Sequence, residues 1–453
     1  MKVIVVGSSH GGYEAVRGML LENPDAEIQW YERGDFISFL SCGMELYLEG
    51  TVKDVNTVSY ETVENAEKDG VHVFVQQEIA SIDEKNKSVH VKNLADGSER
   101  DESFDKLILA IGATPRRLDV PGKDLENLYA MRGRDWAIKL KQKMVDPDLK
   151  HVFVIGSGYI GIEAAEAFAK AGKEVTIVDH NPRLLGNYLD SEFTEKLTQE
   201  FKENGVNFVG SVNVSEFVGK DGKVSAVKTD QGTFDAELVV ETAGVIPNTS
   251  LVKGLLDLDE RGRIKIDEHQ ETSVKDIYAV GDATKVPYAP TGELSSIALA
   301  SNARRQGRTA AANAAGRELK MTAVSGSSAL SVFNYHFAST GVKQDTQEKC
   351  GVTGAESVLI EDWAVPPFVS QEAGNAKVYF KITFDPTDGR ILGGQIMSTR
   401  DVTANINTIS FAIQQHATVY DLAYADFFFQ PGFDRPWNIM NEAAQAAVRK
   451  INK

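Results

Sequence analysis

One cysteine of this chain has neighbours that could make a thiol reactive. Cys42 follows a run rich in serine and phenylalanine, and the segment 43–50 after it predicts a short helix that ends at a glycine. A thiol at the start of a helix lies near the positive end of the helix dipole, which favours the thiolate. The alternative is a small buried cysteine of the core, the commoner role of an isolated cysteine. Cys350 lies in a polar segment and is interpreted as a surface or filler thiol.

The elements before Cys42 follow the pattern of a dinucleotide-binding unit. An apolar strand over residues 2–6 leads into the turn 7–12, a helix, and a second strand that ends at Glu32. In this pattern glycines permit the tight turn, the helix N-terminus binds a pyrophosphate, and the acid accepts a hydrogen bond from a ribose hydroxyl. Ser9 replaces the middle glycine, so this copy alone is weak evidence.

A second, complete copy of the pattern makes the interpretation specific. The strand 151–155 is followed by the three glycines of the turn 156–161, then by a helix and a strand that ends at Asp179. Two dinucleotide sites in one chain are typical of a flavin and a nicotinamide, because hydride passes between these two groups. Asp179 favours NADH over NADPH, since a carboxylate repels a 2′-phosphate. Arg183 lies close in sequence, which leaves NADPH open.

The composition restricts the remaining classes of function. A chain of 453 residues is too long for one core and predicts roughly two to four domains. The net charge of -17 argues against nucleic acid and anionic membrane surfaces as partners, because both need a basic face. The first strand leaves no room for a signal peptide, and no apolar run approaches the ~20 residues that span a bilayer. We therefore expect a soluble, cytoplasmic protein, and we predict no metal site.

The order of motifs predicts an α/β fold with two Rossmann-like domains and a C-terminal α+β domain. The antiparallel strand patterns after residue 325 precede three predicted helices, at 403–416, 419–427 and 438–451. The aromatic run 427–437 is interpreted as core or subunit interface. The predicted domains are an FAD domain formed by 1–120 and 248–320, an NADH domain formed by 121–247, and an interface domain formed by 325–453.

The whole pattern resembles the pyridine nucleotide-disulfide oxidoreductase family. Within it, the segments 8–14, 36–43 and 424–431 resemble the single-cysteine branch, and among its members the NADH peroxidases in particular. That resemblance implies FAD and NADH as cofactors, hydrogen peroxide as substrate, and a homodimer or homotetramer. It implies that Cys42 cycles between thiolate and sulfenic acid, with His10 beside it and Arg304 as the nearby basic residue.

The resemblance also implies which residues hold the cofactors. The residues implied for FAD are Gly7, Ser9, Gly11, Gly12, Glu32, Cys42, Ala110, Ile111, Gly112, Ala113, Arg132, Asp282 and Ala300. The residues implied for NADH are Tyr159, Ile160, Glu163, Asp179, Tyr188, Gly244 and Ala298.

The oxidised form of Cys42 depends on whether a second cysteine is close enough to form a disulfide with it. Two-cysteine members of the family have a second thiol four residues earlier, where this chain has Ser38. Cys42 must therefore oxidise to a sulfenic acid or to a mixed disulfide with an external thiol. The C-terminal histidine of the two-cysteine members is also missing from the segment 430–437. His10 either holds the thiolate or the departing oxygen, with Glu14 one turn on and facing the same way, or only caps its helix.

Several functions remain open beside peroxide reduction. A water-forming NADH oxidase would reduce dioxygen with the same groups. A coenzyme A-disulfide reductase would form a mixed disulfide at Cys42. An electron-transfer flavoprotein would pass electrons to a protein and use Cys42 only structurally, and a sensor of NADH or peroxide would not turn over at all. Peroxide reduction is the prediction.

Overall fold

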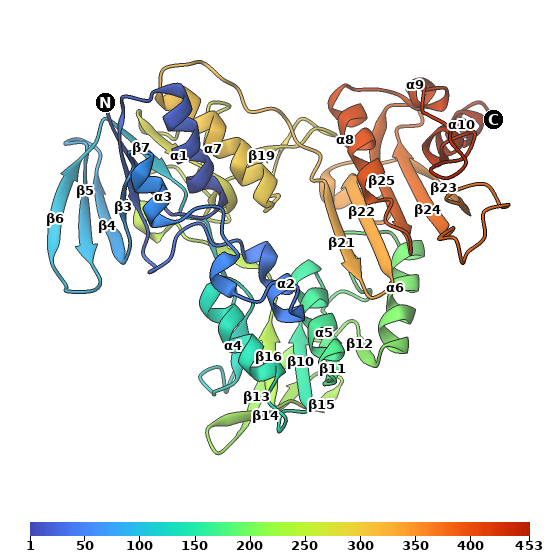
Figure 1. Cartoon of the computed structure of the whole chain (residues 1–453), viewed down its shortest axis with the longest axis horizontal. Coiled ribbons are helices and arrows are strands. Elements are labelled where there is room, and N and C mark those ends of the chain that lie inside the picture. Colours follow the sequence, from blue (N-terminus) through green and yellow to red (C-terminus); the bar gives the residue numbers. More distant parts are fainter.

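The computed structural model describes residues 1–453 and contains three large sheets. The first is a parallel five-stranded sheet with the order β18-β7-β1-β2-β3. Its strands are β1 (Lys2–Val6), β2 (Glu27–Tyr31), β3 (His72–Phe74), β7 (Lys106–Leu109) and β18 (Ile277–Ala279). The helices α1 (His10–Glu22) and α7 (Ala300–Ala314) pack side by side against it (Figure 1), although almost 300 residues separate their starts in the sequence.

A second parallel sheet repeats this design. Its order is β12-β11-β10-β16-β9. The strands are β9 (Leu128–Ala130), β10 (His151–Ile155), β11 (Glu174–Val178), β12 (Val206–Val209) and β16 (Leu238–Glu241). Its helices are α4 (Arg134–Met144), α5 (Tyr159–Lys170) and α6 (Ser191–Glu203). Strands β1 and β10 are continuous apolar runs because each is covered on both faces.

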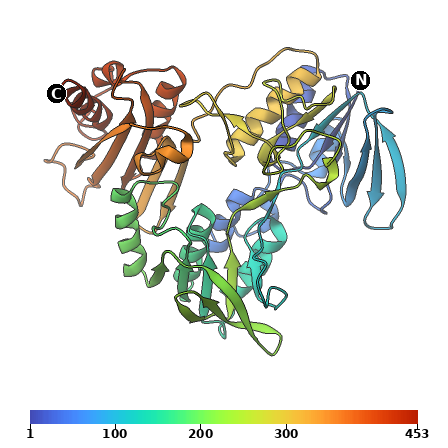
Figure 2. The same ribbon diagram turned by 180° about the vertical axis from the view of Figure 1, so that it is seen from behind.

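The C-terminal sheet is antiparallel, with the order β21-β22-β25-β24-β23. The strands are β21 (Ser328–Val332), β22 (Tyr335–Gly341), β23 (Glu356–Trp363), β24 (Lys377–Phe384) and β25 (Ile391–Ser398). The helices α8 (Ile406–Gln414) and α10 (Ile439–Ile451) pack on it, and α9 (Val419–Ala423) packs against α10 (Figure 2). The predicted fold class is confirmed, whereas the predicted domain boundaries stay predictions.

Smaller elements complete the chain. Two three-stranded antiparallel sheets and two two-stranded ribbons flank the parallel sheets. Their strands are β4 (Gln77–Asp83), β5 (Ser88–Asn93), β6 (Glu99–Ser103), β8 (Ala113–Pro115), β13 (Val214–Lys220), β14 (Lys223–Thr229), β15 (Gly232–Asp235), β17 (Val245–Pro247), β19 (Val286–Pro287) and β20 (Leu294–Ser295). The short helices are α2 (Met44–Glu49) and α3 (Val63–Lys68). Considered by length and hydropathy, none of the helices could cross a lipid bilayer.

Two predictions about the C-terminal part are wrong in detail. Helix α9 ends at Ala423 rather than near residue 427, because side chains of α10 take its last carbonyls: Asn441 donates to Leu422 and Gln445 donates to Ala423. Most of the aromatic run is not core, although Phe427 packs against the core of the C-terminal sheet. Phe428 and Phe433 are 71% and 70% exposed, so for these residues the interface interpretation and exposed recognition remain.

Helix α2 determines where the predicted thiol lies. It follows the first sheet's second strand in the sequence but packs on α4 and α5 of the second unit. Its apolar residues Met44 and Leu48 are fully buried in the core of that unit. Cys42, just before α2, is therefore placed between the two nucleotide-binding units.

Candidate active site between the two nucleotide-binding units

The two glycine turns have the same geometry. Gly7 and Gly156 adopt φ values of +97° and +102°, a conformation that side chains rarely permit. A Cβ on Gly12 would lie 1.9 Å from the carbonyl oxygen of Gly7, and one on Gly161 would lie 1.8 Å from that of Gly156. Each helix therefore starts so close to its strand that only hydrogen fits, as a dinucleotide turn requires.

The serine in the first turn does not impair it. Ser9 has φ -76° and ψ -164°, and the corresponding Gly158 has φ -75° and ψ -176°. This extended backbone suits any residue, so the middle glycine of the fingerprint is not needed for its conformation here. The incomplete first motif thus forms the same turn as the complete second one.

The acid at each strand end is fixed by a serine of the turn. Glu32 Oε2 accepts from the backbone N and Oγ of Ser8, at 3.1 and 2.6 Å. Asp179 Oδ2 accepts from the backbone N and Oγ of Ser157, at 2.7 and 2.8 Å. A carboxylate offers about four acceptor positions, and Glu32 keeps one for a ribose hydroxyl, because only Gly34 N donates to its Oε1. The Oδ1 of Asp179 already accepts from the backbone N and Nδ2 of Asn181, so a ribose hydroxyl would replace one of these contacts. The residues present therefore fit two dinucleotides.

The other residues predicted for FAD gather at the carboxyl edge of the first sheet. The segment 110–113 follows β7, and Asp282 follows β18. Arg132 reaches this edge from the second unit and donates from Nη2 to Asp282 Oδ2 at 2.9 Å. Ala300 is the first residue of α7. Ligands of open α/β sheets bind at this edge, so the arrangement suits the predicted role.

A cavity of about 400 Å³ lies at the matching edge of the second sheet. Asp179, Tyr188 and Gly244 line it, as predicted for NADH residues. The Tyr159 ring packs on Tyr188 with centroids 4.3 Å apart, and the Tyr159 hydroxyl lies 2.6 Å from Ser328 Oγ in the C-terminal sheet. Tyr159 itself and the remaining predicted NADH residues, Ile160, Glu163 and Ala298, lie outside the lining of this cavity.

Cys42 faces His10 across the two units. Its Sγ lies 3.9 Å from His10 Nε2, and His10 is the first residue of α1. The expectation that the helix dipole lowers the pKa of Cys42 is wrong for the protein without its cofactors. Cys42 lies in a 3₁₀ turn before the six-residue α2. Its side chain is exposed to solvent, but desolvation by the surrounding protein atoms, together with the Glu163 carboxylate, raises the pKa of Cys42.

His10 is surrounded by groups that oppose its protonation. Burial and then the Arg304 charge lower the pKa of His10, and the Asp282 carboxylate offsets only part of this effect. Its Nδ1 is buried without a hydrogen-bond partner, and its ring meets Tyr60 edge-on at 6.3 Å. Ser9, not His10, is the cap residue of α1, so the helix-capping role is excluded. His10 is therefore neutral at pH 7.

Glu14 does not pair with His10 as predicted. It accepts from Arg304 at 2.7 and 2.9 Å and from Arg308 at 3.0 Å. The Arg304 guanidinium also lies over the rings of Tyr13 and Tyr60, at 5.1 and 4.8 Å. Arg304 is thus near the thiol site but acts on His10 through its charge.

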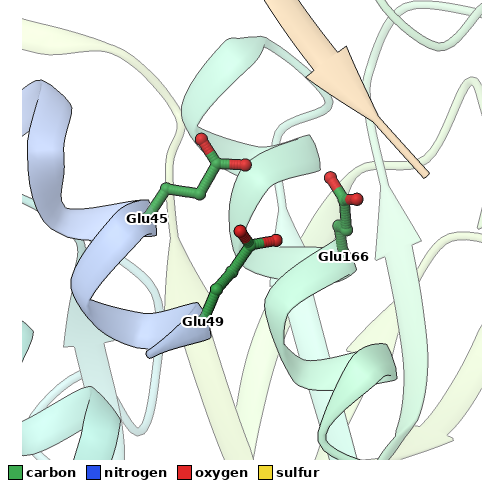
Figure 3. A group of neighbouring side chains, drawn as sticks. All are labelled: Glu45, Glu49 and Glu166. Atoms are coloured by element: carbon green, nitrogen blue, oxygen red, sulfur yellow. The ribbon is translucent and has the colours of Figure 1, made fainter. Parts of the chain in front are cut away.

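Sequence reasoning missed a group of carboxylates beside Cys42. Glu45 and Glu49 of α2 face Glu166 of α5, with carboxylate oxygens within 4.8 Å of one another (Figure 3). Lys170 donates to Glu49 at 2.6 Å and pairs with Glu166 at 2.7 Å. Burial raises the pKa of Glu45 to about 7. It also raises the pKa of Glu163, one turn before Glu166, to about 8. The i,i+4 and i,i+3 spacings were visible in the sequence, but the packing of the two helices was not.

Family models match most of the chain. A model described as pyridine nucleotide-disulphide oxidoreductase matches residues 1–307. A second model, described as the dimerisation domain of this family, matches residues 327–439. The two models thus cover both nucleotide-binding sheets and the whole C-terminal sheet, and the second ends at the first residue of α10.

Known relatives are similar over the full length. An NADH oxidase of Enterococcus faecalis is 40% identical over 452 residues, covering 100% of both proteins. The structure of a water-forming NADH oxidase from Lactobacillus brevis bound to NADH is 37% identical, with a TM-score of 0.95 over 100% of this chain and 99% of that one. An NAD(P)H coenzyme A polysulfide/persulfide reductase of Pyrococcus horikoshii is 27% identical, covering 96% of each protein.

None of these three carries the name NADH peroxidase, so the narrower resemblance found in the sequence stays a prediction. The resemblance to the family as a whole is confirmed by the extent of the family match and by the identity to full-length relatives. The chain belongs to the pyridine nucleotide-disulphide oxidoreductase family.

Proposed function

We propose that this NADH-dependent flavoprotein oxidoreductase reduces dioxygen to water, with Cys42 reducing the hydrogen peroxide formed on the way. In total, two NADH, two protons and one dioxygen give two NAD+ and two waters. The observation that carries the proposal is a single thiol, Sγ 3.9 Å from His10 Nε2, with Ser38 in place of a second cysteine. The full-length similarity to NADH oxidases favours dioxygen over peroxide as the physiological oxidant.

The two turns provide the cofactor sites. FAD, when bound, accepts hydride from NADH and passes electron pairs onward. Glu32 and the turn 7–12 would hold its adenosine and pyrophosphate, and Arg132 with Asp282 would border the rest. Asp179, Tyr188 and Gly244 would hold NADH in the cavity of the second unit.

Cys42 would reduce the hydrogen peroxide formed from dioxygen to water. Its thiolate attacks one oxygen of hydrogen peroxide, the O–O bond breaks, and a sulfenic acid and hydroxide form. Two electrons and a proton then return the sulfenic acid to thiolate and release water. A second proton converts the hydroxide to water, so the two steps together turn one peroxide into two waters.

His10 would orient the oxygen that is being lost. Because it is neutral, its Nε2 can carry a hydrogen and donate it to the sulfenic oxygen or to the departing hydroxide. With Nε2 protonated, the buried Nδ1 is the acceptor nitrogen of the ring. Arg304 would keep the ring in this state by opposing its further protonation.

Reduction of external peroxide is the second candidate. The same Cys42–His10 pair would act on peroxide supplied from outside, and the N-terminal and active-site segments resemble NADH peroxidases. In that case NADH oxidation needs peroxide and not air.

Steady-state NADH oxidation by the holoenzyme separates these functions. We expect turnover in air without peroxide, and a much slower rate under anaerobic conditions until an oxidant is added. Turnover only with peroxide would replace the proposal by the second candidate. Mass spectrometry of the denatured protein tests a third function. A coenzyme A adduct on Cys42, rather than added oxygen, would indicate a coenzyme A-disulfide reductase.

A further inference from the structure

The loop beside Asp179 carries one strongly cationic residue whose partner lies far away in the sequence. Arg183 is the only arginine or lysine between Asp179 and Asp190. Its neighbours Asn181 and Leu185 line the NADH cavity. An arginine in this position suits a phosphate, because its planar group donates two parallel hydrogen bonds. The 2′-phosphate that distinguishes NADPH from NADH would lie near Asp179.

The positive charge of Arg183 is paired with the carboxylate of Asp345. Its Nη1 donates to Asp345 Oδ2 at 2.6 Å. Asp345 belongs to the turn after β22, in the C-terminal part of the chain, and the same oxygen accepts from the backbone N of Ser191 at 2.9 Å. Both side chains of the Arg183–Asp345 pair are 29% exposed.

The carboxylate that holds Arg183 is itself fixed. The backbone N of Asp345 donates to Asp190 Oδ1 at 2.9 Å. Asp190 is fully buried and also accepts from Gln395 at 2.8 Å and pairs with Lys381 at 2.9 Å. The position of Asp345 over the cofactor loop is therefore set by a buried network between the second and C-terminal units.

We propose that Asp345 is a specificity-determining residue that keeps Arg183 away from the 2′-phosphate of NADPH. Two carboxylates would then favour NADH by different means. Asp179 repels the phosphate directly, and Asp345 withholds the cation that would otherwise bind it. The alternative is that the Arg183–Asp345 pair only ties two units together, in which case its loss changes stability and not cofactor choice.

The test measures binding of two small probes to the FAD-loaded enzyme. Adenosine 2′,5′-bisphosphate carries the 2′-phosphate, and 5′-AMP lacks it. Calorimetry gives the ratio of their dissociation constants in a background with Asp179→Ser, where direct repulsion is removed. Asp345→Asn is added to this background because asparagine can still accept from Ser191 but does not hold Arg183 by charge.

We expect Asp345→Asn to strengthen bisphosphate binding relative to 5′-AMP by about tenfold, the effect of one charge-assisted contact. Adding Arg183→Ala should abolish this gain, and kcat/KM for NADPH relative to NADH should follow the same order. Glu348→Gln is the control, because it removes an exposed carboxylate from the same turn. An unchanged ratio, a gain that survives Arg183→Ala, or an equal gain with Glu348→Gln would overturn the proposal.

A further variant keeps the proposal testable if Asp345→Asn does not fold. Arg183→Ala in the Asp179→Ser background should leave the binding ratio unchanged, because Arg183 is already held by Asp345. A clear loss of bisphosphate binding in this variant would mean that Arg183 serves the phosphate in the native arrangement, which contradicts the proposal.

Discussion

The imidazole of His10 is neutral because its burial and the positive charge of Arg304 both disfavour its protonation. Burial has the larger effect, and the Arg304 guanidinium adds to it. We therefore expect the His10 pKa to lie below 6.5 in an NMR titration of histidine-labelled enzyme. Arg304→Gln should raise it, since a positive charge is lost and Glu14 keeps only Arg308. Arg308→Gln is the control and should have a smaller effect, and a His10 pKa that stays unchanged in Arg304→Gln would contradict this account.

The first glycine turn permits a matched pair of substitutions. Gly12→Ala places a Cβ 1.9 Å from a backbone oxygen, so the turn must open. We expect this variant to lose most of its FAD and several kcal/mol of stability, roughly 3 or more. Ser9→Gly should keep its FAD, because the backbone there is ordinary extended chain. Flavin absorbance per chain measures both, and normal FAD content in Gly12→Ala would be inconsistent with the structure.

At the residue scale, the sequence predicted which groups lie together at the site better than it predicted the surroundings that set their pKa values. Cys42 and His10 were predicted as neighbours, and they lie together. The thiol pKa was predicted in the wrong direction, because desolvation raises it and because the Glu163 carboxylate, which adds to this effect, belongs to α5 of the second unit. The Glu14–Arg304 pair joins residues 290 positions apart, which no local pattern reveals.

At the scale of elements, the carboxylate-rich contact between α2 and α5 should make stability depend on pH. The folded protein raises the pKa of Glu45 to about 7 and of Glu163 to about 8, above their ordinary value of 4.5. The folded state thus holds protons that the unfolded chain has already released. The resulting stability is fully present below pH 4.5 and is lost as the pH rises through 8.

Glu163→Gln should reduce this pH dependence. We expect the wild-type enzyme to lose roughly 1–3 kcal/mol of its free energy of unfolding between pH 5 and pH 9, and the variant to lose less. Denaturant unfolding at both pH values measures the difference. Glu195→Gln, an exposed carboxylate on α6, is the control and should behave like the wild type. A steeper dependence in Glu163→Gln would show that this carboxylate is ionised in the fold.

The elements themselves were largely predictable from local patterns. Continuous apolar runs predicted β1 and β10, and the patterns at 330–335 and 378–384 predicted β21 and β24. The first of these patterns runs past the end of β21 into the turn before β22, and β23 was not predicted. The end of α9 was missed, because its last carbonyls are taken by side chains from α10. The packing of α2 on the second unit was also missed, although it is what places Cys42.

At the scale of the whole molecule, the aromatic run 427–437 fits a contact with a second copy of the chain. Phe428 and Phe433 are 71% and 70% exposed, and the family's dimerisation model covers them. We expect Phe428→Asp with Phe433→Asp to shift the enzyme toward the monomer mass in light scattering. Leu21→Asp, which changes an exposed leucine of α1, is the control. An unchanged mass in the double variant would place the subunit contact elsewhere.

The central claim is that Cys42 reduces the peroxide formed from dioxygen before it can leave. The direct test is the ratio of NADH oxidised to dioxygen consumed, in wild type and in Cys42→Ser, with Cys350→Ser as the control. We predict two NADH per dioxygen for the wild type and the control, and one for Cys42→Ser, with the missing equivalents found as hydrogen peroxide. A ratio of two in Cys42→Ser without released peroxide, or no dioxygen consumption by the wild type, would contradict the account.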